Sequence, residues 1–319
     1  MSEKNFKKIL ITGGAGFVGL HMIDALLKRG IDVRVMDNFM CSSRENFKDY
    51  FKKVDFLEGD IRDPQAVKKA VKGMDAVLHF AAIRSVVKTV EDPILAHAVN
   101  ATGALLLLQY SSEAKVKHFI FTSTSSVYGE ATARFQKEES PLRPVSPYGA
   151  AKLAAEHYAG YYYKEGGLAT TSVRIFNVYG PRQNPESCYS LAVPGILSKI
   201  LKMESPVIDG SGEQTRDFVY IGDILEAIFR ILGHPKAFGQ VYNLGSGKTT
   251  SINTLAKTLL RLCGSDLKPV CGPRRPADPE RTCADISKIK KELGWSPKIS
   301  LEQGLKEVIL WVKKEKSVF

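Results

Sequence analysis

Tyr148 and Lys152, in the segment SPYGAAK, are two side chains with acid–base chemistry that stand four residues apart. Ser146 and Pro147 are typical of a helix N-cap and first turn, so both side chains should lie on one helical face. A neighbouring ammonium stabilises a phenolate and lowers the pKa of the phenol, so Tyr148 could act as a base near neutral pH. On its own, the Tyr-x-x-x-Lys pattern is more often an ordinary helix surface.

Five consecutive hydroxyl side chains, Thr122 to Ser126, end a continuous apolar run and stand shortly before that helix. A run of serine and threonine is usually a turn. These side chains have a chemical role only if other motifs point to a binding site nearby.

A glycine-rich turn is such a motif. In GGAGFVG, Gly13, Gly16 and Gly19 are spaced three apart between an apolar strand and a helix, the context of a dinucleotide-binding turn. Glycines let the backbone approach a pyrophosphate at the helix N-terminus. Asp37, eighteen residues after Gly19, is spaced to accept hydrogen bonds from the adenosine ribose and would repel a 2′-phosphate, which favours NAD over NADP. The alternative is a tight turn that binds nothing.

A second glycine cluster, GSGKTT at 245–250, resembles the end of a phosphate-binding P-loop. That motif needs a further glycine five residues before Gly247, where this chain has Tyr242. We therefore reject an ATPase.

The apolar runs ILIT, VRVM, AVLHFAA and HFIFTST are continuous, as strands covered on both faces should be. Amphipathic stretches predict helices near 64–72, 93–113, 147–165, 190–203, 222–233, 251–263 and 301–315. This alternation predicts an α/β fold, a Rossmann-type doubly wound parallel sheet with a smaller mixed α/β substrate domain. We expect an NAD-binding domain at 1–177, to which segments near 216–245 return, and a nucleotide-sugar-binding domain at 178–319.

The 319-residue chain has a net charge of +11, but its basic residues are spread along it. The spread predicts solvated helix faces and no nucleic-acid partner. The five cysteines form no C-x-x-C pair, so we expect reduced thiols and no metal site. There is no apolar run of eighteen residues, and the charged start is unlike a signal peptide, so we expect a cytoplasmic protein that does not bind membranes.

Together these motifs resemble the extended short-chain dehydrogenase/reductase superfamily, in its branch of nucleotide-sugar epimerases and dehydratases. The resemblance covers nearly the whole chain, and its motifs follow the family's order: TGGAGFVG, DN at 37–38, EGDIRD, LHFAA, STSSVYGE, PYGAAK, RIFNVYGP, GEQTRDFVYIGDI, YNLGSG and DISKIKKELGW. It implies bound NAD, a UDP-sugar substrate and a homodimer, with helices 93–113 and 147–165 as candidates for the interface. It also implies that Thr124 bridges the sugar 4-hydroxyl to Tyr148, while Lys152 holds the nicotinamide ribose.

The resemblance assigns two sets of residues. The cofactor-binding set comprises Gly13, Gly16, Phe17, Val18, Gly19, Asp37, Asn38, Asp60, Ile61, Ala81, Ala82, Arg84, Tyr148 and Lys152. The substrate-binding set comprises Ser123, Thr124, Ser125, Asn177, Arg216, Arg275, Arg281 and Thr282. The arginines of this set suit a diphosphate because their forked donors match phosphate oxygens. His79 is expected to be a packed core residue.

The expected reaction is 4-epimerisation of a UDP-sugar through a transient 4-keto intermediate. Family dehydratases carry Asp-Glu where this chain has Ser125 and Ser126, and decarboxylases typically keep a glutamate at the second position. UDP-glucose and UDP-galactose are the expected substrates, and the small Thr282, where some relatives have tyrosine, leaves room for UDP-GlcNAc and UDP-GalNAc. A UDP-glucuronate 4-epimerase, or another nucleotide-sugar dehydratase or reductase, is the alternative. A non-catalytic NAD sensor or RNA-binding relative is disfavoured because such proteins commonly lose the tyrosine and lysine pair.

Overall fold

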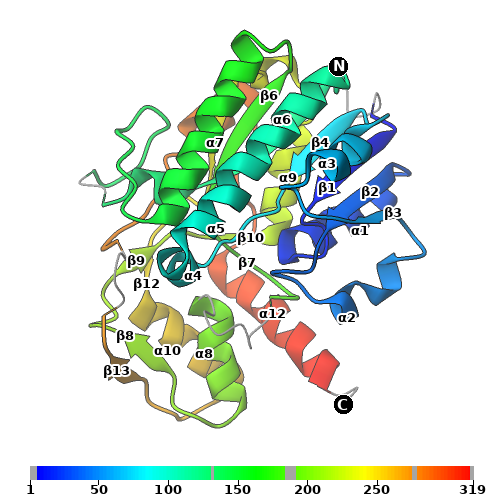
Figure 1. Cartoon of the computed structure of the whole chain (residues 1–319). Coiled ribbons are helices and arrows are strands. Elements are labelled where there is room, and N and C mark those ends of the chain that lie inside the picture. Colours follow the sequence, from blue (N-terminus) through cyan, green and yellow to red (C-terminus); the bar gives the residue numbers. More distant parts are fainter. Residues whose placement is uncertain (1–5, 131–132, 184–191, 275–278, 317–319) are drawn as a thin grey trace.

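A computed structural model describes residues 6–130, 133–183, 192–274 and 279–316 of the chain (Figure 1). At its centre is a seven-stranded sheet with the strand order β11-β6-β5-β4-β1-β2-β3. Every neighbouring pair is parallel, and the winding reverses between β1 and β4. This confirms the predicted doubly wound fold. The strands are β1 (Lys8–Thr12), β2 (Asp32–Asp37), β3 (Asp55–Glu58), β4 (Ala76–His79), β5 (His118–Thr124), β6 (Thr170–Ile175) and β11 (Gln240–Leu244).

Helices cover both faces of this sheet, which explains the continuous apolar runs in its central strands β1, β4 and β5. In β1, Ile9 and Ile11 pack into one core cluster and Leu10 into the other, because successive side chains point to opposite faces. The first cluster includes residues of α1 (Phe17–Leu27), α9 (Ile221–Ile231) and α11 (Ser287–Leu293). The second includes α3 (Pro64–Val71), α6 (Ala104–Glu113) and α7 (Pro147–Lys164), and α6 and α7 cross in front of the sheet in Figure 1.

A second group of elements lies below the sheet in Figure 1, with a core formed by residues of α8, α10 and α12. Three short pairs accompany it: β7 with β10 and β8 with β13, both parallel, and β9 with β12, antiparallel. The elements are β7 (Asn177–Tyr179), α8 (Ala192–Leu201), β8 (Val207–Asp209), β9 (Thr215–Arg216), β10 (Phe218–Tyr220), β12 (Thr250–Ser251), α10 (Ile252–Cys263), β13 (Val270–Gly272) and α12 (Leu301–Lys316). The division of the chain after residue 177 stays a prediction.

Short helical elements occupy several connections. They are α2 (Arg44–Phe47), η2 (Lys48–Tyr50), α4 (Val86–Glu91), α5 (Pro93–His97), η3 (Ala98–Gly103), η4 (Ser125–Tyr128) and η5 (Pro235–Ala237). The single helix predicted at 93–113 is therefore wrong in detail, because the π-helical η3 separates α5 from α6. No helix among the described residues is long and apolar enough to cross a membrane.

Candidate active site

The glycine turn lies at the carboxyl end of β1, pressed against the chain that leaves β4. Gly13 has a φ of +71°, and a Cβ there would lie 2.6 Å from the backbone nitrogen of Ala81. A Cβ at Gly19 would lie 2.5 Å from the Gly13 carbonyl oxygen. Gly16 is the N-cap residue of α1, with no side chain over the first amides of the helix. This bare helix N-terminus, followed by Phe17 and Val18, fits the pyrophosphate of a dinucleotide.

Asp37 ends β2 and is buried beside this turn. Its Oδ2 accepts a hydrogen bond from the Ala15 N–H (3.0 Å), and its Oδ1 accepts from the Phe39 N–H (2.8 Å) and the Ser42 hydroxyl (3.0 Å). The carboxylate thus connects the glycine turn to the loop after β2. This is the carboxyl end of the strands, where an adenosine ribose would lie. Asn38 is exposed next to it.

Asp60 and Ile61 follow β3 and continue the same edge. The Asn38 amide donates to Asp60 Oδ2 (2.9 Å), and Arg62 forms hydrogen bonds to both oxygens of Asp60 (2.9 and 2.7 Å). These bonds to Arg62 lower the pKa of Asp60. Ile61 is buried against Gly103, where a Cβ would lie 2.7 Å from its side chain. Our sequence reasoning did not include Arg62, although it stands within the motif EGDIRD.

The chain leaving β4 carries Ala81 and Ala82, both half-buried, and then Arg84, which is exposed. Buried Asn100 fixes this chain: its Oδ1 accepts from the Ile83 N–H (2.8 Å), and its Nδ2 donates to the Ile83 carbonyl (2.9 Å). Asn100 lies in η3, whose π-helical geometry interrupts the helix predicted there. Such π-helical turns are frequent at functional sites. The sequence reasoning missed Asn100, and periodicity alone gave no signal for it.

Tyr148 and Thr124 come together because α7 begins directly against the end of β5. Ser146 caps α7, its hydroxyl accepting from the Gly149 N–H (3.2 Å), and Pro147 is the first helical residue, as predicted. A Cβ at Gly149 would lie 2.7 Å from the Ser126 carbonyl oxygen, so only glycine allows this close approach. The Thr124 side chain lies close enough to the Tyr148 phenol to act on its pKa.

The pKa of Tyr148 departs from the expectation drawn from the sequence. Burial raises it, and the opposing influences are the Thr124 side chain and the charge of Arg84. Burial outweighs these two influences. The expected effect of the Lys152 ammonium on Tyr148 stays a prediction. Thr124 and Arg84 are therefore the neighbours that favour the phenolate form of Tyr148.

Lys152 lies one turn further along α7 and is buried, with its Nζ 4.3 Å from the centre of the Phe121 ring. Burial lowers its pKa to about 7, and the charge of Glu156 opposes that change. Buried His79 faces the same region, and its pKa is lowered by burial and by the charge of Lys152. His79 accepts from or donates to the Thr12 hydroxyl (2.7 Å), which confirms a packed core histidine.

The hydroxyl run at the end of β5 divides into different environments. Thr124 is buried, and its Oγ1 accepts from the Ser126 N–H (3.2 Å), which starts η4. Ser123 is buried, and its hydroxyl has no hydrogen-bond partner among the described residues. Ser125 and Ser126 are half-buried. The two serines supply hydroxyls where an acid–base pair would need carboxyls.

The predicted substrate residues lie on three segments that meet beyond β6. Asn177 Nδ2 lies 3.5 Å from Thr282 Oγ1, and the Thr282 N–H donates to the Thr215 carbonyl (3.1 Å). Arg216 is buried in β9, and its Nη1 donates to the same Thr215 carbonyl (2.8 Å). Arg281 is exposed beside Thr282. Arg275 lies outside the described residues.

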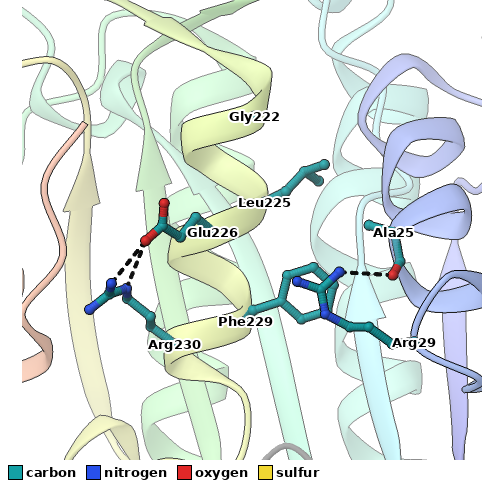
Figure 2. Close-up of a pocket in the computed structure, with 7 residues that line it drawn as sticks. All are labelled: Ala25, Arg29, Gly222, Leu225, Glu226, Phe229 and Arg230. Carbon is teal, nitrogen blue, oxygen red and sulfur yellow. Dashed lines mark hydrogen bonds and ion pairs between the residues drawn. The ribbon is translucent and has the colours of Figure 1, made fainter. Parts of the chain in front are cut away.

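A separate surface pocket of about 590 Å³ lies between α1 and α9 (Figure 2). The Arg29 guanidinium stacks over the Phe229 ring at 3.7 Å, and Arg230 pairs with Glu226 (2.9 Å). None of the predicted site residues lines this pocket. It is therefore distinct from the candidate active site.

A doubly wound parallel sheet, a glycine turn backed by Asp37, and a Tyr148–Lys152 pair on α7 define an NAD(P)-type short-chain dehydrogenase/reductase scaffold. Comparison with known proteins narrows this class. The family model described as GDP-mannose 4,6 dehydratase matches residues 10–308. The chain belongs to this family of nucleotide-sugar epimerases and dehydratases, within the extended short-chain dehydrogenases/reductases.

Individual relatives are similar over almost their whole length. A putative UDP-glucose 4-epimerase from Methanocaldococcus jannaschii is 34% identical, covering 96% of this chain and 98% of that protein. The UDP-glucose 4-epimerase of Thermotoga maritima, solved with UDP-glucose, is 37% identical with a TM-score of 0.92, covering 97% and 99% of the two chains. The Thermus thermophilus UDP-glucose 4-epimerase, solved with NAD, is 34% identical with a TM-score of 0.88, covering 96% and 99%. Other relatives are named as decarboxylases and dehydratases.

Proposed function

We propose that the chain is a UDP-sugar 4-epimerase that works with bound NAD. The observation that carries the proposal is the Tyr148–Thr124 pair at the end of β5, followed by two serines instead of carboxyl groups. Such a site can move one proton at one alcohol, and it lacks the second acid–base pair that water elimination needs. Oxidation and re-reduction at a single carbon is the chemistry that remains.

The cofactor would be held by the residues that surround the glycine turn. The N-cap Gly16 leaves the first amides of α1 without a side-chain cap and so open for a pyrophosphate, and Asp37 stands where ribose hydroxyls could donate to it. When bound, NAD supplies a hydride acceptor that takes hydrogen from C4 of the sugar and returns it. Lys152 is close enough along α7 to hold the nicotinamide ribose as it does in the resembling family.

The protein groups then handle the proton. Tyr148, as phenolate, accepts the proton of the sugar 4-hydroxyl through Thr124. It returns the proton after the 4-keto sugar has rotated to present its opposite face. The cationic nicotinamide ring and Arg84 would both favour the phenolate, against the burial that raises the pKa of Tyr148 in the ligand-free protein. A bound cofactor would therefore help Tyr148 to act as the base.

On the substrate side, Arg216 would bind the diphosphate, with Arg281 and Arg275 as further candidates, while Asn177 and Thr282 contact the nucleotide sugar. UDP-glucose and UDP-galactose are the substrates we propose. Because Thr282 is small, 2-acetamido sugars also fit the proposal. Ser123 and Ser125 complete the proposed substrate set.

We further propose a homodimer formed through α4, α5 and α7. Large apolar side chains gather there at the surface: Ile94 is 80% exposed, Val90 58% and Tyr161 56%. Isolated exposed apolar residues are ordinary, but a group on adjacent helices favours an interface. In the resembling family two helices of each subunit form such an interface.

The reaction is tested by incubating the purified protein separately with UDP-glucose, UDP-galactose, UDP-GlcNAc and UDP-glucuronate, with NMR detection of the C4 configuration. We expect UDP-glucose and UDP-galactose to give the same mixture of the two C4 epimers, without added reductant and without net formation of NADH. A 4-keto-6-deoxy product would instead identify a dehydratase. NADH released in proportion to product would identify a dehydrogenase, and either result contradicts the proposal.

A further inference from the structure

Asp217 lies between β9 and β10 and is fully buried, although nothing in the proposed reaction uses it. Its Oδ1 accepts from the Ser246 N–H (2.6 Å) and the Ser246 hydroxyl (2.7 Å). Its Oδ2 accepts from the Gly247 N–H (3.0 Å) and the Ala284 N–H (3.0 Å). One carboxylate therefore holds two segments, 245–247 and 282–284, that are distant from it in the sequence.

The hydrogen bonds identify the protonation state that fits this site. Three of the four bonds come from backbone N–H groups, which can only donate, and the Ser246 hydroxyl can rotate to donate as well, so an ionised carboxylate can accept all four. Burial raises the pKa of Asp217, and the bonds from Ser246, Ala284 and Gly247 counteract that change. The ionised carboxylate is the form that matches its surroundings.

The glycine cluster at 245–247 is shaped around this carboxylate. A Cβ at Gly245 would lie 2.7 Å from Asp217 Oδ2 and 2.5 Å from the Ala284 Cβ, and Gly247 has a φ of +70°. Successive backbone amides in such turns bind anions, as they do around phosphates in P-loops. Here the P-loop-like sequence binds a carboxylate from its own chain.

The segments that Asp217 joins carry the predicted substrate residues. The Asp217 carbonyl accepts from the Asn177 N–H (2.9 Å), Arg216 is its direct neighbour, and Thr282 stands two residues before Ala284. The 3.5 Å approach of Asn177 to Thr282 depends on how these segments are held together.

We propose that Asp217 is a positioning residue of the nucleotide-sugar site. Its carboxylate joins the segments that carry Arg216 and Thr282 through the 245–247 turn, and its backbone carbonyl holds the segment that carries Asn177. The inference rests on the proposed function of that site. It predicts that substrate binding depends on an anion in the turn, whether that anion belongs to Asp217 or to a small molecule.

The first test removes single bonds. Ser246→Ala deletes one donor and leaves the carboxylate, and Asp217→Asn keeps the shape but places an amide against amide donors. We expect UDP binding, measured by titration calorimetry, to weaken roughly tenfold in Ser246→Ala and further in Asp217→Asn, because hydrogen bonds to charged groups are among the stronger ones. KM should rise while kcat and NAD content change little.

The matched control is Asp75→Asn, directly before the amino end of β4. Asp75 also accepts two backbone N–H bonds, from Lys7 (2.8 Å) and Lys8 (3.0 Å), so its loss should lower stability without changing UDP affinity. An equal loss of UDP affinity in this control would mean that general destabilisation explains the result, and it would overturn the inference.

The second test is chemical rescue. Asp217→Ala leaves room for a small carboxylate, so added formate should restore part of the UDP affinity and raise the melting temperature of this variant only. Folded Asp217→Ala that binds UDP weakly and gains nothing from formate overturns the inference, as does unchanged UDP affinity in both Asp217→Asn and Ser246→Ala. If Asp217→Ala does not fold, Ser246→Ala still decides the question.

The two proposals fail separately. Unchanged protein that binds UDP but does not invert C4 contradicts the proposed reaction alone. If the unsubstituted protein is active and the Asp217 and Ser246 variants bind UDP as tightly as it does, only the positioning role is contradicted.

Discussion

Tyr148 is the residue that carries the proton in the proposed reaction. We expect Tyr148→Phe to keep its NAD and lose roughly 100- to 10,000-fold in turnover, the usual contribution of a general base. Turnover is measured by NMR and NAD by its release on denaturation. Tyr163→Phe, on the exposed side of the same helix, should leave turnover unchanged. Unchanged turnover in Tyr148→Phe would refute the assigned role.

Lys152 gives the ligand-free protein a pH-dependent stability. Its pKa is lowered from 10.5 to about 7 by burial, so between these values the folded state has lost a proton that the unfolded state keeps. The free energy of unfolding therefore rises with pH through this window, while below about pH 7 the full cost of burying the ammonium applies.

Lys152→Met removes this dependence. We expect the variant to exceed the unchanged protein in stability by the largest margin at pH 6 to 7, and the margin to shrink by about 2 kcal/mol towards pH 9, since each pKa unit corresponds to about 1.4 kcal/mol. Denaturant unfolding at each pH measures it. Lys164→Met, exposed at the end of the same helix, should follow the unchanged protein. A margin that does not vary with pH would contradict the buried-lysine argument.

At the level of elements, sequence patterns predicted the strand–turn–helix unit, the capped start of α7 and the order of β and α elements. Those features depend on local rules, namely glycine in a positive-φ turn, a serine N-cap and apolar periodicity. The π-helical η3 and the hydrogen bonds of Asn100 to Ile83 were not predictable in this way, because they depend on a contact between separate segments. The same holds for the four bonds to Asp217, although Asp217 stands within a motif we quoted.

The glycine turn offers a test in which strain and steric conflict can be separated. Gly13 and Gly30 have almost the same φ, +71° and +69°. A Cβ at Gly13 would lie 2.6 Å from the Ala81 nitrogen, whereas a Cβ at Gly30 would have no described atom within 4 Å. We expect Gly30→Ala to cost about 1–2 kcal/mol of stability and to retain NAD. Gly13→Ala should cost more and lose bound NAD, as measured by thermal unfolding and cofactor content. Equal behaviour of the two variants would contradict the role given to the Ala81 contact.

Over the whole molecule, several lysines lie at the C-terminal ends of the helices that cover the sheet. Helices of a doubly wound fold end on the side where the parallel strands begin. Here these helix ends carry lysines: Lys28 directly after α1, Lys68 and Lys69 in α3, and Lys164 in α7. Lysines complement the partial negative charge of helix C-termini. The candidate site lies at the opposite edge, where helix N-termini favour anionic ligands. The architecture of the fold therefore places part of the net charge of +11 at helix ends.

The proposed dimer can be tested through the most exposed apolar residue on its face. Ile94, 80% exposed on α5, would be buried between subunits, so Ile94→Asp places a charge in an apolar contact and should convert the dimer to a monomer. Light scattering coupled to gel filtration measures the mass. Leu310→Asp is the matched control, because Leu310 is 61% exposed on α12, away from that face, and should keep the mass of the unchanged protein. A monomeric unsubstituted protein would refute the proposed dimer. A dimer that survives Ile94→Asp but not Leu310→Asp would place the interface elsewhere, since only burial of the α4–α5–α7 face makes the two substitutions differ in the expected direction.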